Sequence, residues 1–204
     1  MRVIGLTGGI ASGKSLVSEQ LAERGAIVVN ADKVGHEAYR RGTETYRAVV
    51  EAFGPEVVGP EGEIDRRALG AKVFADPEAR RRLEEIVWPA MRRMMEERLA
   101  ELRAGGAQVA VLEAALLIEA DWLPLVDEVW LVTASPETAR RRLMERNGLS
   151  PEQAEERLRA QLTNEKRRSY ADVIIENDGS LEELRRAVDE AWSKLEARAG
   201  EVAR

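Results

Sequence analysis

The sequence predicts an α/β protein in which five parallel strands form one sheet with helices on both faces. Five short apolar runs alternate with segments of helical spacing, and these runs cover residues 3–6, 26–30, 108–112, 127–133 and 173–175. A glycine-rich loop joins the first run directly to a helix. The 204 residues, 44% of them hydrophobic and 33% charged, suffice for one globular domain with insertions and a sizeable core.

Composition excludes several classes of protein. The absence of cysteine excludes disulfides, thiolate metal sites and a cysteine nucleophile. The net charge of −6, with both signs mixed along the chain, argues against a nucleic-acid partner. The chain enters a strand at once without the pattern of a signal peptide, and no apolar run is long enough to cross a membrane. We therefore expect a cytoplasmic protein with no membrane contact.

Residues 8–15, here called the phosphate loop, match the pattern G-x-x-x-x-G-K-S between the first strand and a helix. Gly8 and Gly13 allow backbone angles that turn successive N–H groups inward, and the helix adds the positive end of its dipole. Lys14 supplies a charge for the β and γ phosphates of a nucleoside triphosphate, and the Ser15 hydroxyl can bind magnesium. The candidate nucleotide-binding residues here are Gly8, Gly9, Ala11, Ser12, Gly13, Lys14, Ser15 and Leu16. The alternative is a plain turn that caps the helix, but a full match in this context is uncommon by chance.

The second strand ends at Asn30, and Asp32 follows it closely. Open α/β sheets place their ligands at the carboxyl ends of strands, so Asp32 lies where chemistry is expected. Aspartate is also a good N-cap for the helix that follows, and the two roles can coexist. Position alone leaves both interpretations open.

Residues 32–104 are predicted to be helical and to contain no strand. A mixed segment at 34–53 has apolar residues at roughly helical spacing. Asp65 is expected to cap one helix, and Pro77 to occupy the first position of the next. Pro89 is expected to kink or end that helix. The stretch is therefore a long helical insertion between strands two and three.

Glu113 directly follows strand three. Four apolar residues before an acid form a pattern of the Walker B type, in which the carboxylate holds magnesium directly or through water. Such runs are common in α/β proteins, so the pattern gains weight only beside the phosphate loop. Glu113 and Ser15 are the candidate magnesium residues.

The helix after strand four carries Arg142 and Arg146 one turn apart, on the same face. Together they could bind a triphosphate, and the alternative is a solvated basic face paired with nearby glutamates. A second charged helix follows the break at Asn147 and Gly148. Two short charged helices inserted after strand four, at residues 140–162, suit a mobile lid over the phosphates.

The chain closes with strand five, a turn at 177–180 and an amphipathic helix at 181–197. His36 and the four scattered tryptophans are interpreted as surface or packing residues, so no Ser-His-Asp set is expected. Residues 199–204 are expected to fray.

This ordered set of motifs resembles the dephospho-coenzyme A kinase family from about Val3 to Trp192. The resemblance rests on the phosphate loop, on Asn30-Ala31-Asp32, and on the segment from Gly62 to Arg66. Further matches are Gln161 and the segments 83–89, 116–119, 142–150 and 171–180. Four positions depart from the usual family pattern, because the chain has Asn30 for Asp, Trp88 for His, Leu16 for Thr, and Glu113-Ala114-Ala115 for Asp-x-Pro.

The resemblance implies a single P-loop kinase domain over residues 1–204, with a core at 1–31, 105–139 and 163–198, a helical substrate insertion at 32–104 and a lid at 140–162. It also implies ATP with Mg²⁺ as the phosphoryl donor and the ribose 3′-hydroxyl of dephospho-coenzyme A as the acceptor. The products would be coenzyme A and ADP, which is the final step of coenzyme A biosynthesis. The resemblance marks Asp32 as catalytic.

The leading hypothesis is in-line phosphoryl transfer by four catalytic candidates, Lys14, Asp32, Arg142 and Arg146. Lys14 and the loop N–H groups hold the phosphates, Asp32 accepts the proton of the hydroxyl, and the two arginines neutralise charge as the lid closes. Asn177 and Gly179 are candidate contacts for the adenine. We expect a monomer or a weak homo-oligomer.

Three rival functions remain at this point. The first is a kinase of another small hydroxyl or nucleotide substrate, such as a nucleoside monophosphate. The second is a nucleotide switch that acts through a partner, against which the chain has no Asn-Lys-x-Asp for guanine. The third is a coenzyme-A-binding module without activity, suggested by the changed polar positions.

Overall fold

The chain divides into two compact units in the computed structural model, which describes residues 1–202. Unit 1 comprises Met1–Val29 and Leu102–Arg204, and unit 2 comprises Asn30–Glu101. Apart from Asn30, unit 2 therefore lies in the stretch of sequence between the second and third strands.

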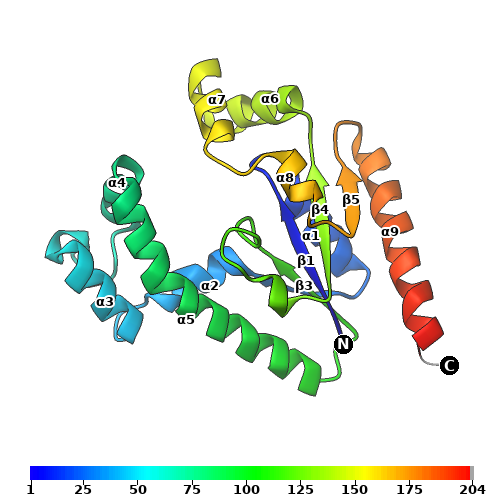
Figure 1. Cartoon of the computed structure of the whole chain (residues 1–204), viewed down its shortest axis with the longest axis horizontal. Coiled ribbons are helices and arrows are strands. Elements are labelled where there is room, and N and C mark those ends of the chain that lie inside the picture. The colour runs from blue at the N-terminus through cyan, green and yellow to red at the C-terminus, as the bar shows by residue number, and fades with distance from the viewer. Residues whose placement is uncertain (203–204) are drawn as a thin grey trace. The chain divides into compact units, whose positions relative to one another are not determined.

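Unit 1 is built on a five-stranded parallel sheet in the order β2-β3-β1-β4-β5. Strands β1, β3, β4 and β5 are labelled in Figure 1. Its strands are β1 (Arg2–Gly8), β2 (Ile27–Asn30), β3 (Val109–Glu113), β4 (Glu128–Thr133) and β5 (Val173–Glu176). The central strand β1 pairs with β3 on one side, where Gly5 is opposite Leu112, and with β4 on the other, where Gly5 is opposite Val129. The predicted α/β class with a five-stranded parallel sheet is confirmed.

Alternate residues of the central strands point to opposite faces of the sheet. On one face, Ile4, Leu6 and Trp130 belong to a buried core with side chains of α1 (Lys14–Glu23) and α9 (Leu181–Val202). On the other face, Gly5 leaves room for neighbouring side chains, since a Cβ there would lie 2.7 Å from Leu117. Hydrophobic side chains therefore cover both faces of β1.

Local sequence signals explain the helices that follow β4, which are α6 (Pro136–Asn147), α7 (Pro151–Arg159) and α8 (Asn164–Arg168). Ser135 caps α6 by accepting the Thr138 N–H at 3.2 Å, and Gly148 ends it in a left-handed conformation with φ 64°. Ser150 and Gln153 form a capping box at the start of α7. The short α8 was not expected, because five residues are too few for a periodic apolar pattern.

Helix α9 extends beyond its expected end at Ala197 to Val202. A helix can fray at its end, so the expectation that residues 199–202 fray stays a prediction, while residues 203–204 lie outside the described part of the chain.

Unit 2 is helical, as expected, and contains α2 (Ala31–Ala38), α3 (Glu44–Phe53), the short η1 (Pro55–Val57), α4 (Arg66–Ala75) and most of α5 (Pro77–Ala104). The segment at 34–53 is divided between two helices, because Thr43 caps α3 by accepting the Tyr46 N–H at 3.0 Å. Asp65 caps α4 as expected, accepting the N–H groups of Arg67 and Ala68.

Pro89 does not end its helix, because α5 runs without interruption from Pro77 to Ala104. Buried apolar side chains continue on both sides of the proline, with Val87 before it and Met91, Met95 and Leu99 after it. Packing of this stripe offsets the one backbone hydrogen bond that proline cannot donate.

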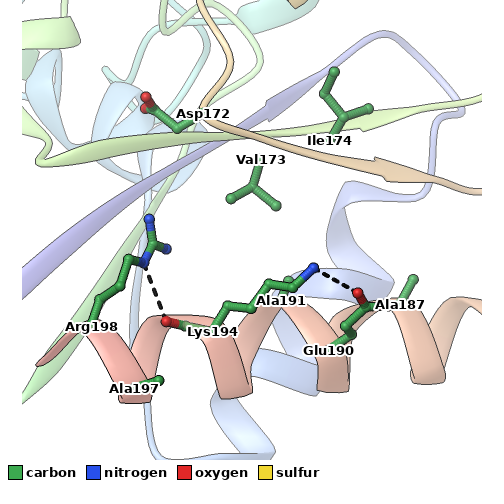
Figure 2. Close-up of a pocket in the computed structure, with 9 residues that line it drawn as sticks. All are labelled: Asp172, Val173, Ile174, Ala187, Glu190, Ala191, Lys194, Ala197 and Arg198. Atoms are coloured by element: carbon green, nitrogen blue, oxygen red, sulfur yellow. Dashed lines mark hydrogen bonds and ion pairs between the residues drawn. The ribbon is translucent and has the colours of Figure 1, made fainter. Parts of the chain in front are cut away.

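Strand β5 forms one edge of the sheet, and its Ile174 side chain is 40% exposed. A groove of about 610 Å³ lies between β5 and α9 (Figure 2). Both basic side chains of this groove form ion pairs, Lys194 with Glu190 at 2.6 Å and Arg198 with Glu128 at 2.9 Å. Over residues 1–202, no helix combines the length and the apolar character needed to cross a membrane.

Candidate active site

The phosphate loop adopts a conformation that requires glycine at two positions. Gly13 has φ 97°, and a Cβ on it would lie 2.1 Å from Asn177 Nδ2. A Cβ on Gly8 would lie 2.3 Å from the Val132 carbonyl oxygen. Ala11 also has a positive φ, of 60°, which is unusual outside glycine and is typical of functional loops. This local geometry agrees with a loop whose N–H groups turn toward an anion.

The structure brings the two candidate magnesium residues together. The Ser15 hydroxyl donates a hydrogen bond to Glu113 Oε1 at 3.2 Å. Glu113 is buried at the end of β3, where it is opposite Leu6 of β1. Residues 1–202 hold no group of three or more His, Cys, Asp or Glu placed to bind a metal. A hydroxyl and a carboxylate fit Mg²⁺, which prefers oxygen ligands and takes the rest of its shell from water and phosphate.

Arg142 and Arg146 face the phosphate loop across a hollow of about 560 Å³. Its lining consists of loop residues and one face of α6, namely Gly9, Ala11, Ser12, Gly13, Lys14, Ser15, Leu16, Arg142, Glu145 and Arg146. The lysine and the two arginines give this hollow three positive charges against one glutamate. Lys14 Nζ donates to the Gly8 carbonyl at 2.9 Å. Such an arrangement can bind a polyphosphate.

Asn177 ties the turn after β5 to the phosphate loop. Its buried side chain donates from Nδ2 to the Ser12 carbonyl at 2.8 Å, and its Oδ1 lies 3.4 Å from Arg142 Nη2. Gly179 lies in the same turn, followed by Ser180, whose N–H donates to the Glu183 carboxylate at 2.7 Å to cap α9. The adenine contact of Asn177 and Gly179 stays a prediction.

Asp32 lies exposed in the first turn of α2, within unit 2. The N-cap of this helix is Asn30, whose Oδ1 accepts the Lys33 N–H at 3.0 Å. The alternative role of Asp32 as the cap is therefore wrong, because the helix begins directly at the end of β2 and not after Asp32. Since asparagine caps as well as aspartate, the change at position 30 preserves the cap.

His36 follows Asp32 by one turn of α2, and Arg66 at the start of α4 donates to its ring at 2.9 Å. His36 is exposed, in agreement with its interpretation as a surface residue. Burial raises the pKa of the Tyr39 hydroxyl nearby, and the charge of Arg66 offsets part of this rise.

Two residues close to the phosphate loop received no role from the sequence. Gln161 accepts the Ile10 N–H at 2.9 Å, and Arg167, in α8, is 2% exposed. Gln161 is one of the positions that match the family pattern, but the sequence suggested no role for its side chain. Arg167 stands in a run of three basic residues, and nothing in that run identifies the buried one.

Comparison with known proteins identifies the family of the chain. The family model described as dephospho-CoA kinase matches residues 2–183. The dephospho-CoA kinase of Geobacter sulfurreducens is 52% identical over 95% of this chain and 98% of its own length, and that of Geobacillus kaustophilus is 43% identical over 95% and 98%.

Solved structures are similar to this chain in fold. The dephospho-CoA kinase of Campylobacter jejuni is similar with a TM-score of 0.73 and 28% identity, over 96% of this chain and 98% of that one. A shikimate kinase of Acinetobacter baumannii, 16% identical over 97% and 94% with a TM-score of 0.56, shares the fold alone. The chain therefore belongs to the dephospho-CoA kinase family, whose members carry out the final step of coenzyme A biosynthesis.

Proposed function

We propose that the chain transfers the γ-phosphoryl group of ATP to the ribose 3′-hydroxyl of dephospho-coenzyme A, giving coenzyme A and ADP. One observation supports this reaction above the others. A glycine-constrained loop and two arginines of the proposed lid surround one hollow, and Ser15 of this lining contacts the Glu113 carboxylate, in a chain of this family. Phosphoryl transfer needs mainly positioning and neutralisation of charge, which these groups can supply.

The phosphates of ATP would lie in the hollow beside α6. N–H groups of the phosphate loop other than that of Ile10, which donates to Gln161, bind the phosphate oxygens, and Lys14 interacts with the β and γ phosphates. Arg142 and Arg146 neutralise the charge that develops on the transferred group. Because the Asn177 side chain already binds the loop, the backbone of the turn at 177–179 is left for the adenine.

Ser15 and Glu113 would hold Mg²⁺, Ser15 through its hydroxyl and Glu113 through a bound water. The ion would supply positive charge that offsets the charge of the phosphates. The supporting observation is the distance of 3.2 Å between Ser15 Oγ, in the first turn of α1, and Glu113 Oε1, at the carboxyl end of β3. Magnesium titration of ADP binding, compared between the native chain and Glu113→Ala, tests this assignment without turnover.

Asp32 would accept the proton of the attacking 3′-hydroxyl. Its support is its place directly after β2, its exposure, and the fact that Asn30 takes the capping role. Unit 2 would hold dephospho-coenzyme A, and residues 140–162 would act as the lid.

The test is ADP release from ATP with dephospho-coenzyme A, AMP, CMP, adenosine, shikimate or water as acceptor, followed by the mass of the product. We expect a response with dephospho-coenzyme A and a product heavier by one phosphate. Another preferred acceptor would contradict the proposed substrate. ATP turnover with water alone, or ligand binding without ADP release, would contradict phosphoryl transfer altogether.

The role of Asp32 has its own test. Asp32→Asn should lower kcat by about 10² to 10⁴, the usual contribution of a general base, with little change in the KM for ATP. Asp65→Asn is the matched control, because asparagine preserves the α4 cap in the same unit. Turnover of Asp32→Asn within about threefold of the native chain, roughly 0.7 kcal/mol in the barrier, would exclude this role.

We also propose a cytoplasmic enzyme that binds no nucleic acid, since its substrate ATP is cytoplasmic and its net charge is −6. A monomer or weak homo-oligomer is favoured because the large exposed apolar side chains of the described residues, such as Phe74, Ile174 and Leu181, lie on different elements. Sedimentation velocity over a range of concentrations tests the oligomeric state.

A further inference from the structure

The end of the proposed lid and the segment after it lie beside the first half of the phosphate loop. Gln161 Oε1 accepts the Ile10 N–H at 2.9 Å. A Cβ on Gly9 would lie 3.6 Å from Gln161 Oε1, 3.7 Å from Arg167 Nη1 and 3.8 Å from Asn164 Oδ1. Three polar side chains from residues 161–167 thus lie close to Gly9, and one of them bonds Ile10.

This segment is anchored to the core of unit 1. Arg167 is 2% exposed, and it donates from Nη1 to the Leu162 carbonyl and from Nη2 to Glu119 Oε1, the latter at 3.2 Å. Asn164 Nδ2 donates to the Ala134 carbonyl at 3.0 Å, directly after β4. A buried guanidinium stays charged, so its pairing with Glu119 fixes where α8 lies. Gln161 therefore reaches the loop from a rigid support.

The second half of the loop has a separate support. Asn177 donates to the Ser12 carbonyl, and Arg142 of α6 contacts the Asn177 amide oxygen. The proposed lid at 140–162 is thus connected to the loop at two places. Near the start of the lid, Arg142 contacts Asn177, which bonds the loop, and near the end of the lid Gln161 bonds the loop directly.

We propose that Gln161 is a positioning residue for nucleotide binding, which holds the first half of the phosphate loop and links it to the end of the lid. Gly8 and Gly9 precede Ile10, and glycine gives the backbone more conformational freedom than any other residue. An acceptor for the Ile10 N–H restricts that freedom before the nucleotide arrives. Preorganisation of this kind increases affinity, because less entropy is lost on binding. The inference rests on the proposed binding of ATP phosphates by this loop.

Gln161→Met tests the inference, since methionine keeps the length and approximate volume of glutamine but cannot accept this hydrogen bond. Gln153→Met is the matched control. Gln153 belongs to the same lid, and its Oε1 accepts the Ser150 N–H at 3.0 Å in the capping box of α7. It is absent from the lining of the hollow beside the loop. Three measurements are made on both variants: hydrogen exchange of the loop in ligand-free protein, ADP affinity by calorimetry, and the KM of each substrate.

We expect Gln161→Met to bind ADP about tenfold more weakly, which corresponds to about 1.4 kcal/mol. The KM for ATP should rise by a similar factor, the KM for dephospho-coenzyme A should stay within twofold, and the Ile10 amide should exchange faster. Gln153→Met should accelerate exchange in α7 and leave ADP affinity unchanged.

Two results would overturn the inference. The first is ADP affinity of Gln161→Met within twofold of the native chain, and the second is an equal loss in Gln153→Met, which would assign the effect to lid stability. Failure of the native chain to bind ADP would overturn the nucleotide-binding role of the loop itself, and the inference with it.

Discussion

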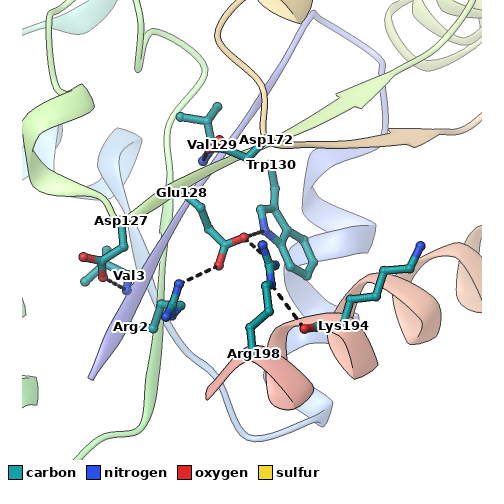
Figure 3. Close-up of polar contacts among 9 residues, drawn as sticks. All are labelled: Arg2, Val3, Asp127, Glu128, Val129, Trp130, Asp172, Lys194 and Arg198. Atoms are coloured by element: carbon teal, nitrogen blue, oxygen red, sulfur yellow. Dashed lines mark hydrogen bonds and ion pairs between the residues drawn. The ribbon is translucent and has the colours of Figure 1, made fainter. Parts of the chain in front are cut away.

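Polar side chains serve different purposes at the two ends of the sheet in unit 1. At the amino end, acidic side chains interact with backbone N–H groups and arginine side chains of unit 1 (Figure 3). Asp127 accepts the Val3 N–H at 2.6 Å, and Asp172 accepts the Val129 N–H at 2.7 Å. At the carboxyl end, polar groups surround the hollow beside the phosphate loop.

Glu128, at the amino end, interacts with three other side chains. It is 5% exposed, and its Oε2 accepts from Trp130 Nε1 at 3.1 Å and from Arg198 at 2.9 Å (Figure 3). Its other oxygen lies 3.6 Å from an Arg2 nitrogen. Strand β1, strand β4 and helix α9 are thereby joined through one carboxylate.

The carboxyl end faces the hollow that would bind the nucleotide. Ser15 contacts Glu113 there at 3.2 Å, and Arg142 contacts Asn177 at 3.4 Å. We therefore expect chemistry at the carboxyl end of the sheet and a structural role at the amino end, since ligands usually bind beyond the carboxyl ends of parallel strands. Substitutions at the two ends should separate these properties.

Lys14→Met should give the largest effect. Removing a charge from the transition state should lower kcat/KM by about 10³-fold, roughly 4 kcal/mol, while the urea midpoint of unfolding changes little. Lys194→Met is the matched control, because Lys194 forms an exposed ion pair with Glu190 in the groove of Figure 2. Activity of Lys14→Met within tenfold of the native chain would contradict the assignment of chemistry to the carboxyl end.

Glu128→Ala should show the opposite separation. It removes the acceptor of the buried Trp130 Nε1, so the free energy of unfolding should fall by about 2 kcal/mol, while both KM values stay within twofold. Urea unfolding and steady-state kinetics measure the two effects. Glu190→Ala, which removes an exposed glutamate of α9, should leave both unchanged. A loss of activity in Glu128→Ala without a loss of stability would break the comparison.

Local signals in the sequence predicted much of the fold and of the loop. Gly148 and Asp65 act as break and cap where expected, because their effects depend on neighbouring backbone alone. Glu113 and Ser15 were predicted as a pair from the Walker B type of pattern beside the phosphate loop, and their side chains contact at 3.2 Å.

Features that depend on tertiary packing could not be predicted in this way. Pro89 does not end its helix, since buried apolar side chains on both sides of it favour continuation, and a kink at Pro89 stays a prediction. Asn30 replaced Asp32 as the cap because the helix begins without an intervening loop. The contact from Gln161 to Ile10 spans 151 residues, and no spacing in the sequence indicates such a pair.

Asp178 lies at the carboxyl end, but like Asp127 and Asp172 at the amino end it accepts a hydrogen bond from a backbone N–H. Its substitution should give the smallest effect of this series. Burial raises the pKa of its carboxyl, but hydrogen bonds from Ser135 and Thr138 and the charge of Arg142 outweigh burial and leave the pKa below its ordinary value. The carboxylate, which accepts the Ser135 N–H at 2.8 Å, therefore stabilises the folded state above the unfolded pKa of about 3.8, and this contribution is lost as pH falls through the lower folded pKa.

Asp178→Asn should accordingly reduce the fall in unfolding free energy between pH 7 and pH 3, measured by urea unfolding at both values. Because Asp178 is exposed, solvent screens its interactions, and the effect should be smaller than that of Glu128→Ala. If the carboxyl end separates ligand-binding groups from structural ones, kcat/KM at pH 7 should change by less than threefold. A large loss of activity at unchanged acid sensitivity would instead place Asp178 among the groups that act on Arg142 during turnover.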